Sequence, residues 1–240
     1  MKEKIIQQGA EAILIQQDNK LIKRRIKKSY RIKEIDEKLR KQRTKSEAKL
    51  LGKASKLISV PEIIKVNEKE KEIDMQFIEG KKLSEHLDSL ENKEEIAEEI
   101  GKQVAKIHDA DIIHGDLTTS NMILVENTNK ILNDKTNAKN IEDNINNKNI
   151  NNSKMPEQEE GMKESKFLVY FIDFGLGFHS SRIEDKAVDL HLLRQALEAK
   201  HYKNWQSLFS AVLKGYKESK NYEATIKQLK KVEARGRYKH

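Results

Sequence analysis

Two short motifs constrain this chain more than any other feature of its sequence. HGDLTTSNMIL, at 114–124, sets Asp116 and Asn121 five residues apart and then runs into apolar residues. FLVYFIDFG, at 167–175, is a continuous apolar run that ends in Asp173 and a glycine. A short apolar run of this kind is typical of a buried strand. We therefore expect Asp173 at the end of such a strand, where its carboxylate faces a cleft.

The two motifs meet if their apolar runs, 122–125 and 168–172, pair as a hairpin. Asp116 and Asn121 then lie across one cleft from Asp173. Phosphoryl transfer needs a carboxylate that orients the attacking hydroxyl or water, together with oxygen ligands for the hard Mg2+ ion. We predict Asp116 as the orienting carboxylate, and Asn121 and Asp173 as the metal ligands. A structural turn followed by a capping acid is the open alternative.

The segment between the motifs has a different composition from the rest of the chain. Residues 127–154 contain 11 asparagines, with many lysines and almost no aromatic side chains. Such a segment cannot bury enough apolar surface to fold alone. We expect 127–165 to be a disordered insertion that loops out between the two strands.

Apolar periodicity predicts a strand-rich front half and a helical rear half. At the start of one expected helix, Asn92 and Glu95 have the spacing of a capping box. The expected strands are two or three antiparallel ones within 3–26, then 60–67 and 72–80; the expected helices are 32–57, 93–110, 183–199, 203–217 and 222–234.

Several classes of protein are disfavoured by the sequence. The longest apolar run, FLVYFI, is far shorter than a membrane span, and the acids within the N-terminal apolar stretch do not fit a secretory signal. There is no cysteine, which excludes disulfides and thiolate metal sites. We expect a soluble intracellular protein without membrane contact, cytoplasmic and with nuclear residence also open.

Basic residues are concentrated in two places. Residues 19–56 hold 16 Lys/Arg against 4 Asp/Glu, and residues 226–240 hold 6 against 1, in a chain of net charge +8. Such concentration favours an anionic partner, with RNA the first candidate. A solvated helix face would show the same pattern and is the alternative.

The two motifs resemble the H-x-D-x-x-x-x-N and D-F-G motifs of the protein-kinase superfamily, in the same order. Kinases usually separate them by roughly twenty residues, whereas Asp116 and Asp173 are 57 positions apart. The insertion accounts for the excess, which supports the hairpin.

The kinase resemblance implies further site residues upstream and downstream of the motifs. Lys23, in KLIK, would contact the α- and β-phosphates, and Glu47 would pair with it. The implied ATP-binding residues are completed by Gly9 and Glu11 of QQGAEA, where a glycine-rich loop should lie, and by Gln76 and Ile78 of MQFIEG, whose backbone would meet adenine. His114 and Asp189 would support the catalytic loop.

The chain resembles one kinase family more closely, the small atypical serine/threonine kinases of the KEOPS complex. That resemblance is carried by QGAEA, IKRRIKKSYRIKEIDEKLRKQRTKSEAKLL, MQFIEG, HGDLTTSN, IDFGLGF, EDKAVDL and the terminal RGR. It implies an α+β, bilobal protein-kinase-like fold with a small β-rich N-lobe (1–78) that has one long helix, and a reduced helical C-lobe (79–240).

The same resemblance implies an activity, cofactors and partners. The activity is ATP hydrolysis and weak serine/threonine phosphorylation with ATP and Mg2+, in support of threonylcarbamoyl adenosine formation on tRNA. The implied partners are the tRNA threonylcarbamoyl transferase subunit, other KEOPS subunits and tRNA. The expected tRNA or partner contacts are Arg24, Arg25, Arg40, Lys41, Arg235 and Arg237.

The chain also departs from ordinary kinases. Gly115 stands where an arginine usually grips a phosphorylated activation loop, and no A-P-E motif follows Asp173. Thr118 replaces a lysine that many serine/threonine kinases carry. We therefore expect no activation by loop phosphorylation, and ATP hydrolysis as the main reaction.

Two other functions remain open from the sequence. Small-molecule phosphotransferases of the aminoglycoside or choline kinase type share the H-G-D-x-x-x-x-N loop, but only 65 residues follow Gly175 here, which is short for their substrate domain. A non-catalytic pseudokinase scaffold is the second alternative.

Overall fold

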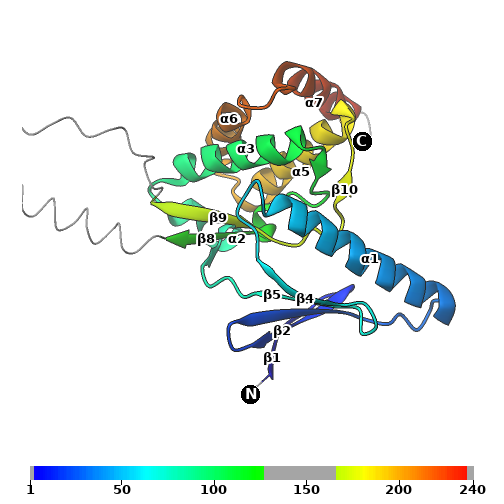
Figure 1. Ribbon diagram of the computed structural model, residues 1–240. Coiled ribbons are helices and arrows are strands. Elements are labelled where there is room, and N and C mark those ends of the chain that lie inside the picture. Colours follow the sequence, from blue (N-terminus) through cyan, green and yellow to red (C-terminus); the bar gives the residue numbers. More distant parts are fainter. Residues whose placement is uncertain (1–2, 127–165, 237–240) are drawn as a thin grey trace, which may run out of the picture.

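The computed structural model describes residues 3–126 and 166–236. Its first part is an antiparallel sheet of five strands in the order β1-β2-β3-β5-β4, packed against one long helix, α1 (Figure 1). The expected strands and the expected long helix of the front half are therefore confirmed. Their bounds are β1 Glu3–Gln8, β2 Ala12–Gln17, β3 Lys20–Arg25, α1 Lys33–Ala54, β4 Ile63–Asn67 and β5 Glu72–Gln76.

Helix α1 is attached to the rest of the molecule mainly through its C-terminal half. Its apolar residues Leu50, Leu51 and Ala54 are buried there, whereas its N-terminal half is dominated by charged side chains. The buried polar side chains of α1 are Asp36, in its first turn, and Thr44 and Glu47, farther along the helix. Because Glu47 points inward from a charged helix, it needs a cationic partner.

The second part is mainly helical, with one small sheet of three strands and one of two strands between the helices (Figure 1). Strands β8 and β9 pair antiparallel with Met122 opposite Phe171, which confirms the predicted hairpin. The bounds are β6 Lys81–Lys82, α2 Leu83–His86, α3 Lys93–Asp109, β7 Ile112–Ile113, β8 Met122–Glu126, β9 Phe167–Phe171, β10 Phe178–His179, α5 Ile183–Lys200, α6 Trp205–Tyr216 and α7 Tyr222–Gly236, with 3-10 turns η1 Leu87–Ser89 and η2 Thr119–Asn121.

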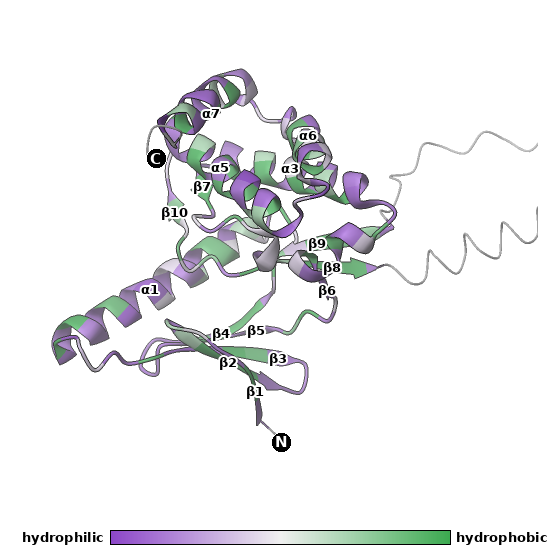
Figure 2. Cartoon of the chain, turned by 180° about the vertical axis from the view of Figure 1, so that it is seen from behind, coloured by the Kyte–Doolittle hydropathy of each residue, from purple (hydrophilic) through white to green (hydrophobic). Residues whose placement is uncertain are grey.

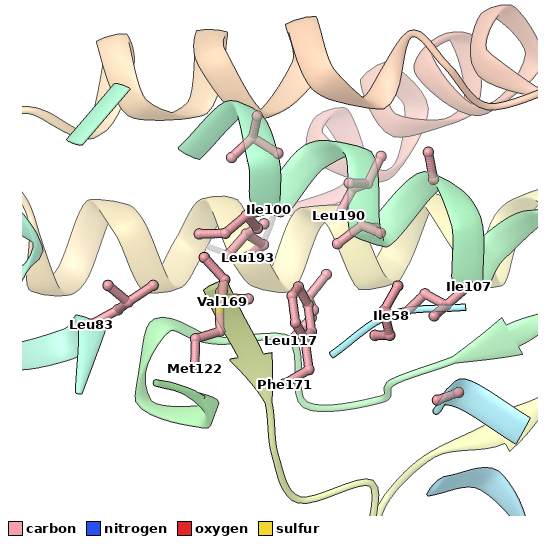
Figure 3. Close-up of a cluster of buried hydrophobic side chains, with 14 of the residues drawn as sticks. Ile58, Leu83, Ile100, Ile107, Leu117, Met122, Val169, Phe171, Leu190 and Leu193 are labelled. Carbon is pink, nitrogen blue, oxygen red and sulfur yellow. The ribbon is translucent and has the colours of Figure 1, made fainter. Parts of the chain in front are cut away.

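The main core lies beneath the hairpin. Strands β8 and β9 are largely hydrophobic (Figure 2), and Figure 3 shows Met122, Val169 and Phe171 from the hairpin packed with Ile100 of α3 and Leu193 of α5. All five are at most 1% exposed. Each Å2 of apolar surface removed from water stabilises a fold by about 25 cal/mol. This cluster therefore contributes strongly to the stability of the second part. Asp116 and Asn121 precede β8, and Asp173 follows β9. Packing of the hairpin on the helices therefore holds these three residues in place.

Helices α3 and α6 cross at close range. A Cβ atom on Gly101 would lie 2.0 Å from the carbonyl oxygen of Val212, so only glycine permits this approach. Helices α5 and α7 likewise pack against each other, and α5 also contacts α6.

The predicted capping box is wrong. Asn92 is the N-cap residue of α3, but its side chain makes no capping hydrogen bond. Its backbone, at φ −96° and ψ 28°, is not in the extended conformation from which a cap side chain reaches the first helical N–H groups. Among the described helices, none has the length and apolar character needed to cross a membrane. The expected insertion at 127–165 lies outside the described residues.

Candidate active site

Two adjoining cavities bring the motifs together. The first, of about 260 Å3, is lined by the loop after β1 and by both motifs, with Lys23, Asp116 and Asp173 in its wall. The second shares Lys23 and Asp173 and adds Asn121 and Glu47. Because the cavities share four lining residues, Gln7, Leu14, Lys23 and Asp173, they are parts of one cleft between the sheet and the helical part.

Lys23 lies at the centre of this cleft. Its ammonium is 2.6 Å from Glu47 Oε1 and 2.7 Å from Asp173 Oδ1. Burial alone would lower the pKa of Lys23, but the charges of Glu47 and Asp173 outweigh burial and hold that pKa above its ordinary value. Lys23 is therefore a fixed positive charge, and the predicted pairing with Glu47 is present in the structure.

Asp173 presents its carboxylate to the cleft from a turn. Its φ of 60° is rare for a residue other than glycine, and the fully buried Phe174 anchors the turn from below. Burial raises the pKa of Asp173, but the charge of Lys23 and the hydrogen bond from Lys23 outweigh it, so the pKa lies below its ordinary value. The carboxylate is ionised and 49% exposed, which leaves it open to a ligand.

Asn121 and Asp116 are joined to each other. The amide nitrogen of Asn121 donates to the backbone oxygen of Asp116 at 2.9 Å and to its carboxylate Oδ2 at 2.8 Å. These bonds use the Nδ2 group and orient the amide oxygen of Asn121 as the acceptor atom. The five-residue spacing therefore lets residues 116–121 form a turn that these two hydrogen bonds close.

Asp189, from α5, holds the loop that carries Asp116 from beneath. Its carboxylate accepts the backbone N–H groups of His114 and Gly115 at 2.9 and 3.0 Å, and lies 3.2 Å from His108 Nε2. Burial raises the pKa of Asp189, but the hydrogen bond and charge of His108 outweigh it and keep the pKa below its ordinary value. His108 in turn contacts the hydroxyl of Tyr216 at 3.0 Å. This series of contacts therefore links Asp189 to α6.

His114 and Gly115 fill structural positions in that loop. The His114 ring is fully buried, lies 3.1 Å from the carbonyl oxygen of Ile172, and packs 4.5 Å from the ring of Phe174. Gly115 has a φ of 77°, and a Cβ there would lie 2.4 Å from the carbonyl oxygen of Leu176. An arginine could not occupy this position, which explains the departure from ordinary kinases in terms of packing.

Sequence reasoning misplaced Arg25. The structure contradicts its predicted tRNA contact, because Arg25 is only 6% exposed and its guanidinium binds Glu47 Oε2. Side chains two apart on a strand share a face, so Lys23 and Arg25 reach the same carboxylate. That alternation in KLIKRR was the signal that could have identified Arg25.

Sequence reasoning also missed a second support of the loop. His201 is buried, with its ring nitrogens 2.9 Å from Asp88 Oδ2 and 3.1 Å from the hydroxyl of Thr119. Thr119 lies between Asp116 and Asn121, so this contact ties the motif to the C-terminal end of α5.

Of the other four predicted ATP-binding residues, two line the first cavity and two line neither cavity. Gly9 and Glu11 line the first cavity, but the Glu11 carboxylate is bound to Arg43 of α1. Gln76 and Ile78 are not part of either cavity lining. The Gln76 N–H already donates to the carbonyl oxygen of Glu62 at 2.8 Å.

The remaining basic residues lie outside the cavities and carry acidic partners. Arg24 binds Glu72, and Lys41 lies 3.7 Å from Glu68. The other described pairs are Arg40 with Asp36 at 2.7 Å and Arg235 with Glu184 at 2.6 Å. Arg237 lies outside the described residues.

The donor set of the cleft fits Mg2+. Within 3–126 and 166–236 no three His, Cys, Asp or Glu side chains gather as a metal cluster. Mg2+ does not require one, since it keeps several waters and is bound through one or two carboxylates plus substrate phosphates. Asp173 and the amide oxygen of Asn121, both in the wall of one cavity, are ligands of that kind.

Comparisons with known proteins place this chain among RIO-domain and Bud32 sequences. The RIO domain family model matches residues 14–148. The chain is 38% identical to the KEOPS complex subunit Bud32 of Pyrococcus abyssi, over 98% of this chain and 96% of that protein. It is 33% identical to a probable serine/threonine-protein kinase BUD32 homolog of Archaeoglobus fulgidus, over 96% of this chain and 94% of that protein.

A longer relative and a solved structure extend the comparison. A probable bifunctional tRNA threonylcarbamoyladenosine biosynthesis protein of Methanobrevibacter smithii is 38% identical over the whole chain, which spans 38% of its length. The Rio2 kinase from Chaetomium thermophilum, solved as an ADP/Mg2+-phosphoaspartate complex, matches with a TM-score of 0.52 at 13% identity, covering 96% of this chain and 70% of that one. At this identity the likeness shows the fold.

Proposed function

The chain belongs to the RIO-domain family of atypical kinases, in its Bud32 group, and on that basis we propose that it is a Mg2+-dependent ATPase and serine/threonine kinase of a KEOPS complex. Its proposed role is to support threonylcarbamoyl adenosine formation on tRNA. The names of the Bud32 relatives support the assembly, and the bifunctional relative supports the tRNA pathway.

One observation carries the enzymatic part of the proposal. Lys23 lies between Glu47 and Asp173, at 2.6 and 2.7 Å, in a cavity that Asp116 also lines. A kinase needs a lysine–glutamate ion pair and a metal-binding aspartate in place together. Buried charges persist only when paired, and here the cavity leaves the Asp173 end of the array accessible.

The residues of the cleft take distinct roles in this proposal. Lys23 binds the α- and β-phosphates, and Glu47 keeps its ammonium aimed at them. Asp116 orients the attacking water or hydroxyl, while Asn121 and Asp173 hold the metal. Mg2+ held by these two residues would neutralise charge that develops on the phosphates. Asp189 holds the Asp116 loop in position through the backbone N–H groups of His114 and Gly115.

The cleft also suggests the place of the nucleotide base. We assign residues 1–78 to an N-lobe and 79–240 to a C-lobe, with adenine between them. The apolar part of the second cavity, formed by Leu14, Leu21, Met75 and Ile172, suits the faces of a purine ring. The backbone near Ile78 is the proposed hinge.

The proposed partners follow from the relatives and from the charge pattern. They are the threonylcarbamoyl transferase subunit, other KEOPS subunits and tRNA, and we place the complex in the cytoplasm. Lys41 is exposed, and Arg24 is 47% exposed. Of their acidic partners, Glu68 is 40% exposed and Glu72 is 15% exposed, and ion pairs with an exposed member contribute about 0–1 kcal/mol. Phosphates of tRNA could therefore replace them.

The test is ATP turnover with and without partners. We expect phosphate release that requires Mg2+ and rises when the transferase subunit and tRNA are added. Asp173→Ala should reduce turnover on the order of a hundredfold or more, since metal clamps carry much of the charge stabilisation. Glu218→Ala, an exposed acid at the end of α6, is the matched control and should keep full turnover.

The same assay separates the alternatives. Unchanged turnover in Asp173→Ala would favour a non-catalytic scaffold. Phosphorylation of amines such as choline or an aminoglycoside, with no response to tRNA, would favour a small-molecule phosphotransferase.

A further inference from the structure

The loop that covers the first cavity is held by charge. Residues Gly9, Ala10 and Glu11 line the cavity. The Glu11 carboxylate accepts a hydrogen bond from Arg43 Nη1 of α1 at 2.6 Å. Lys28 donates to the carbonyl oxygen of Ala10. Two segments far from the loop in sequence therefore tie down a loop whose three residues are exposed.

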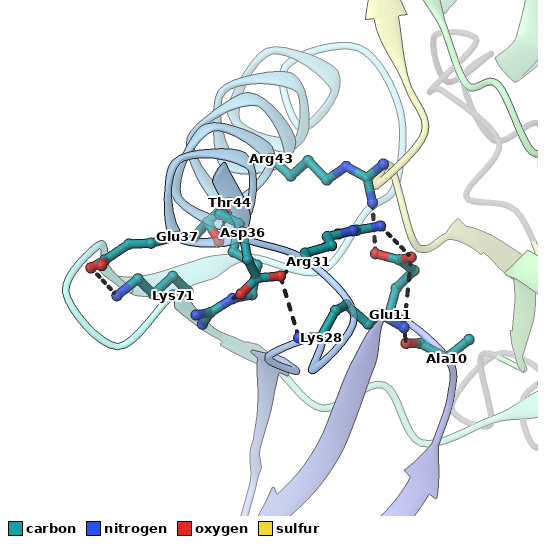
Figure 4. Close-up of polar contacts among 10 residues, drawn as sticks. Ala10, Glu11, Lys28, Arg31, Asp36, Glu37, Arg43, Thr44 and Lys71 are labelled. Carbon is teal, nitrogen blue, oxygen red and sulfur yellow. Dashed lines mark hydrogen bonds and ion pairs between the residues drawn. The ribbon is translucent and has the colours of Figure 1, made fainter. Parts of the chain in front are cut away.

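Further cations surround the same carboxylate. Lys28 Nζ and Arg31 Nη2 each lie 3.9 Å from Glu11 Oε1. Arg31 also lies 3.8 Å from Asp36, and the Lys28 N–H donates to Asp36 at 3.3 Å (Figure 4). Asp36 is 1% exposed. The cations that face Glu11 are thus held by a buried acid at the start of α1.

A carboxylate at this position is unusual for a loop that faces phosphates. Ordinary kinases use a glycine-rich loop over the phosphates, whereas this loop has Gly9 alone. An unpaired Glu11 would repel the phosphates, since like charges disfavour each other at close range. Its pairing with Arg43 removes that repulsion and gives the side chain a mechanical role.

Helix α1 connects this contact to the centre of the cleft. Arg43 and Glu47 are one helical turn apart, so they project from the same face of α1. Arg43 reaches the loop and Glu47 reaches Lys23. Closure of the loop and the position of the phosphate-binding lysine therefore depend on the same helix turn.

We propose that the Glu11–Arg43 ion pair is a latch that holds the nucleotide-covering loop onto α1 and slows nucleotide release. The inference rests on the proposed function, because it takes a nucleotide as the occupant of the cavity. Glu11 and Arg43 are positioning residues here. Their contact is with each other, and it acts on the nucleotide through the loop.

The experiment is a double-mutant cycle on nucleotide dissociation. Glu11→Gln, Arg43→Gln and the double variant are loaded with Mg2+ and the fluorescent analogue N-methylanthraniloyl-ADP, and release is followed by stopped flow after a chase with ADP. Each single variant should release the analogue about two- to fivefold faster, the range that an exposed ion pair supports. The double variant should be no faster than either single one.

Salt and a remote pair provide the controls. Raising the ionic strength should speed release from the wild type more than from the variants, because salt screens an exposed pair. Glu98→Gln and Lys214→Gln remove an ion pair of the same 2.6 Å length between α3 and α6, and neither should alter release. Melting temperatures of all variants, followed alongside, should match the wild type.

The possible outcomes separate the latch from its alternatives. Additive effects of the two substitutions would overturn the latch. A large loss of turnover in Arg43→Gln with no effect of Glu11→Gln would show that Arg43 touches the phosphates directly, and would also overturn it. A wild type that binds no analogue would overturn the proposed function and the latch together.

Discussion

Replacing Glu47 by glutamine removes the charge that two buried cations share. Lys23 is 8% exposed and Arg25 is 6% exposed, and both bind the Glu47 carboxylate, which is 1% exposed. After the substitution, Asp173 still faces Lys23, whereas Arg25 loses its carboxylate partner. An uncompensated charge then remains inside the protein.

The size of the effect follows from this burial. Removing one partner of a buried ion pair costs about 3–5 kcal/mol, and the glutamine keeps one acceptor oxygen, so we take the lower end, about 3 kcal/mol. For a chain of this length each kcal/mol shifts the melting temperature by about 2–4 °C. Thermal unfolding followed by circular dichroism at pH 7.5 should therefore show a melting temperature lower by about 6–12 °C.

A control on the same helix makes the test specific. Glu37 of α1 pairs with Lys71 at 3.0 Å, but its side chain is 56% exposed. Glu37→Gln should leave the melting temperature close to that of the wild type. If Glu47→Gln lost less than about 1 kcal/mol, or no more than Glu37→Gln, the reasoning from a shared buried carboxylate would be wrong.

Three further substitutions test other parts of the account. Asp189→Asn replaces an acceptor of two backbone N–H groups by an amide and should cost about 2–4 kcal/mol at neutral pH. Because the folded pKa of Asp189 lies below its ordinary value, the wild type's advantage in urea unfolding should be constant above about pH 5 and shrink as pH falls below about 4; an advantage that grows in acid would contradict this. Gly115→Ala should cost about 1–3 kcal/mol, measured by urea unfolding, since its φ is 77° and a Cβ would meet Leu176; full stability would refute the close approach. Charge reversal at Arg24 and Lys41 should weaken tRNA binding and flatten its dependence on salt in filter binding, and an unaltered salt slope would remove the proposed contact.

The sequence determined the centre of the site because local patterns specify it. Asp116, Asn121 and Asp173 flank two apolar runs that can pair with each other, and the pairing of β8 with β9 then brings the three residues to one cleft. The helices with regular apolar spacing were predicted within a few residues for the same reason. The family resemblance supplied Lys23 and Glu47, which spacing alone could not single out in a lysine-rich segment.

Other features depended on contacts that no local pattern encodes. Strands β6, β7 and β10 have two residues each, too few to show any periodicity. The Glu11–Arg43 contact joins residues from different elements, and its partner choice is set by how α1 packs on the sheet. Arg25 was assigned to the surface by composition, although the face of β3 that it shares with Lys23 turns inward.

The most direct test of the account is a structure of the protein with Mg2+ and a non-hydrolysable ATP analogue. We expect the phosphates against Lys23 and the ion between Asn121 and Asp173, with Asp116 facing the terminal phosphate. A nucleotide bound elsewhere on the chain, with Lys23 still closed onto Asp173, would contradict the central claim.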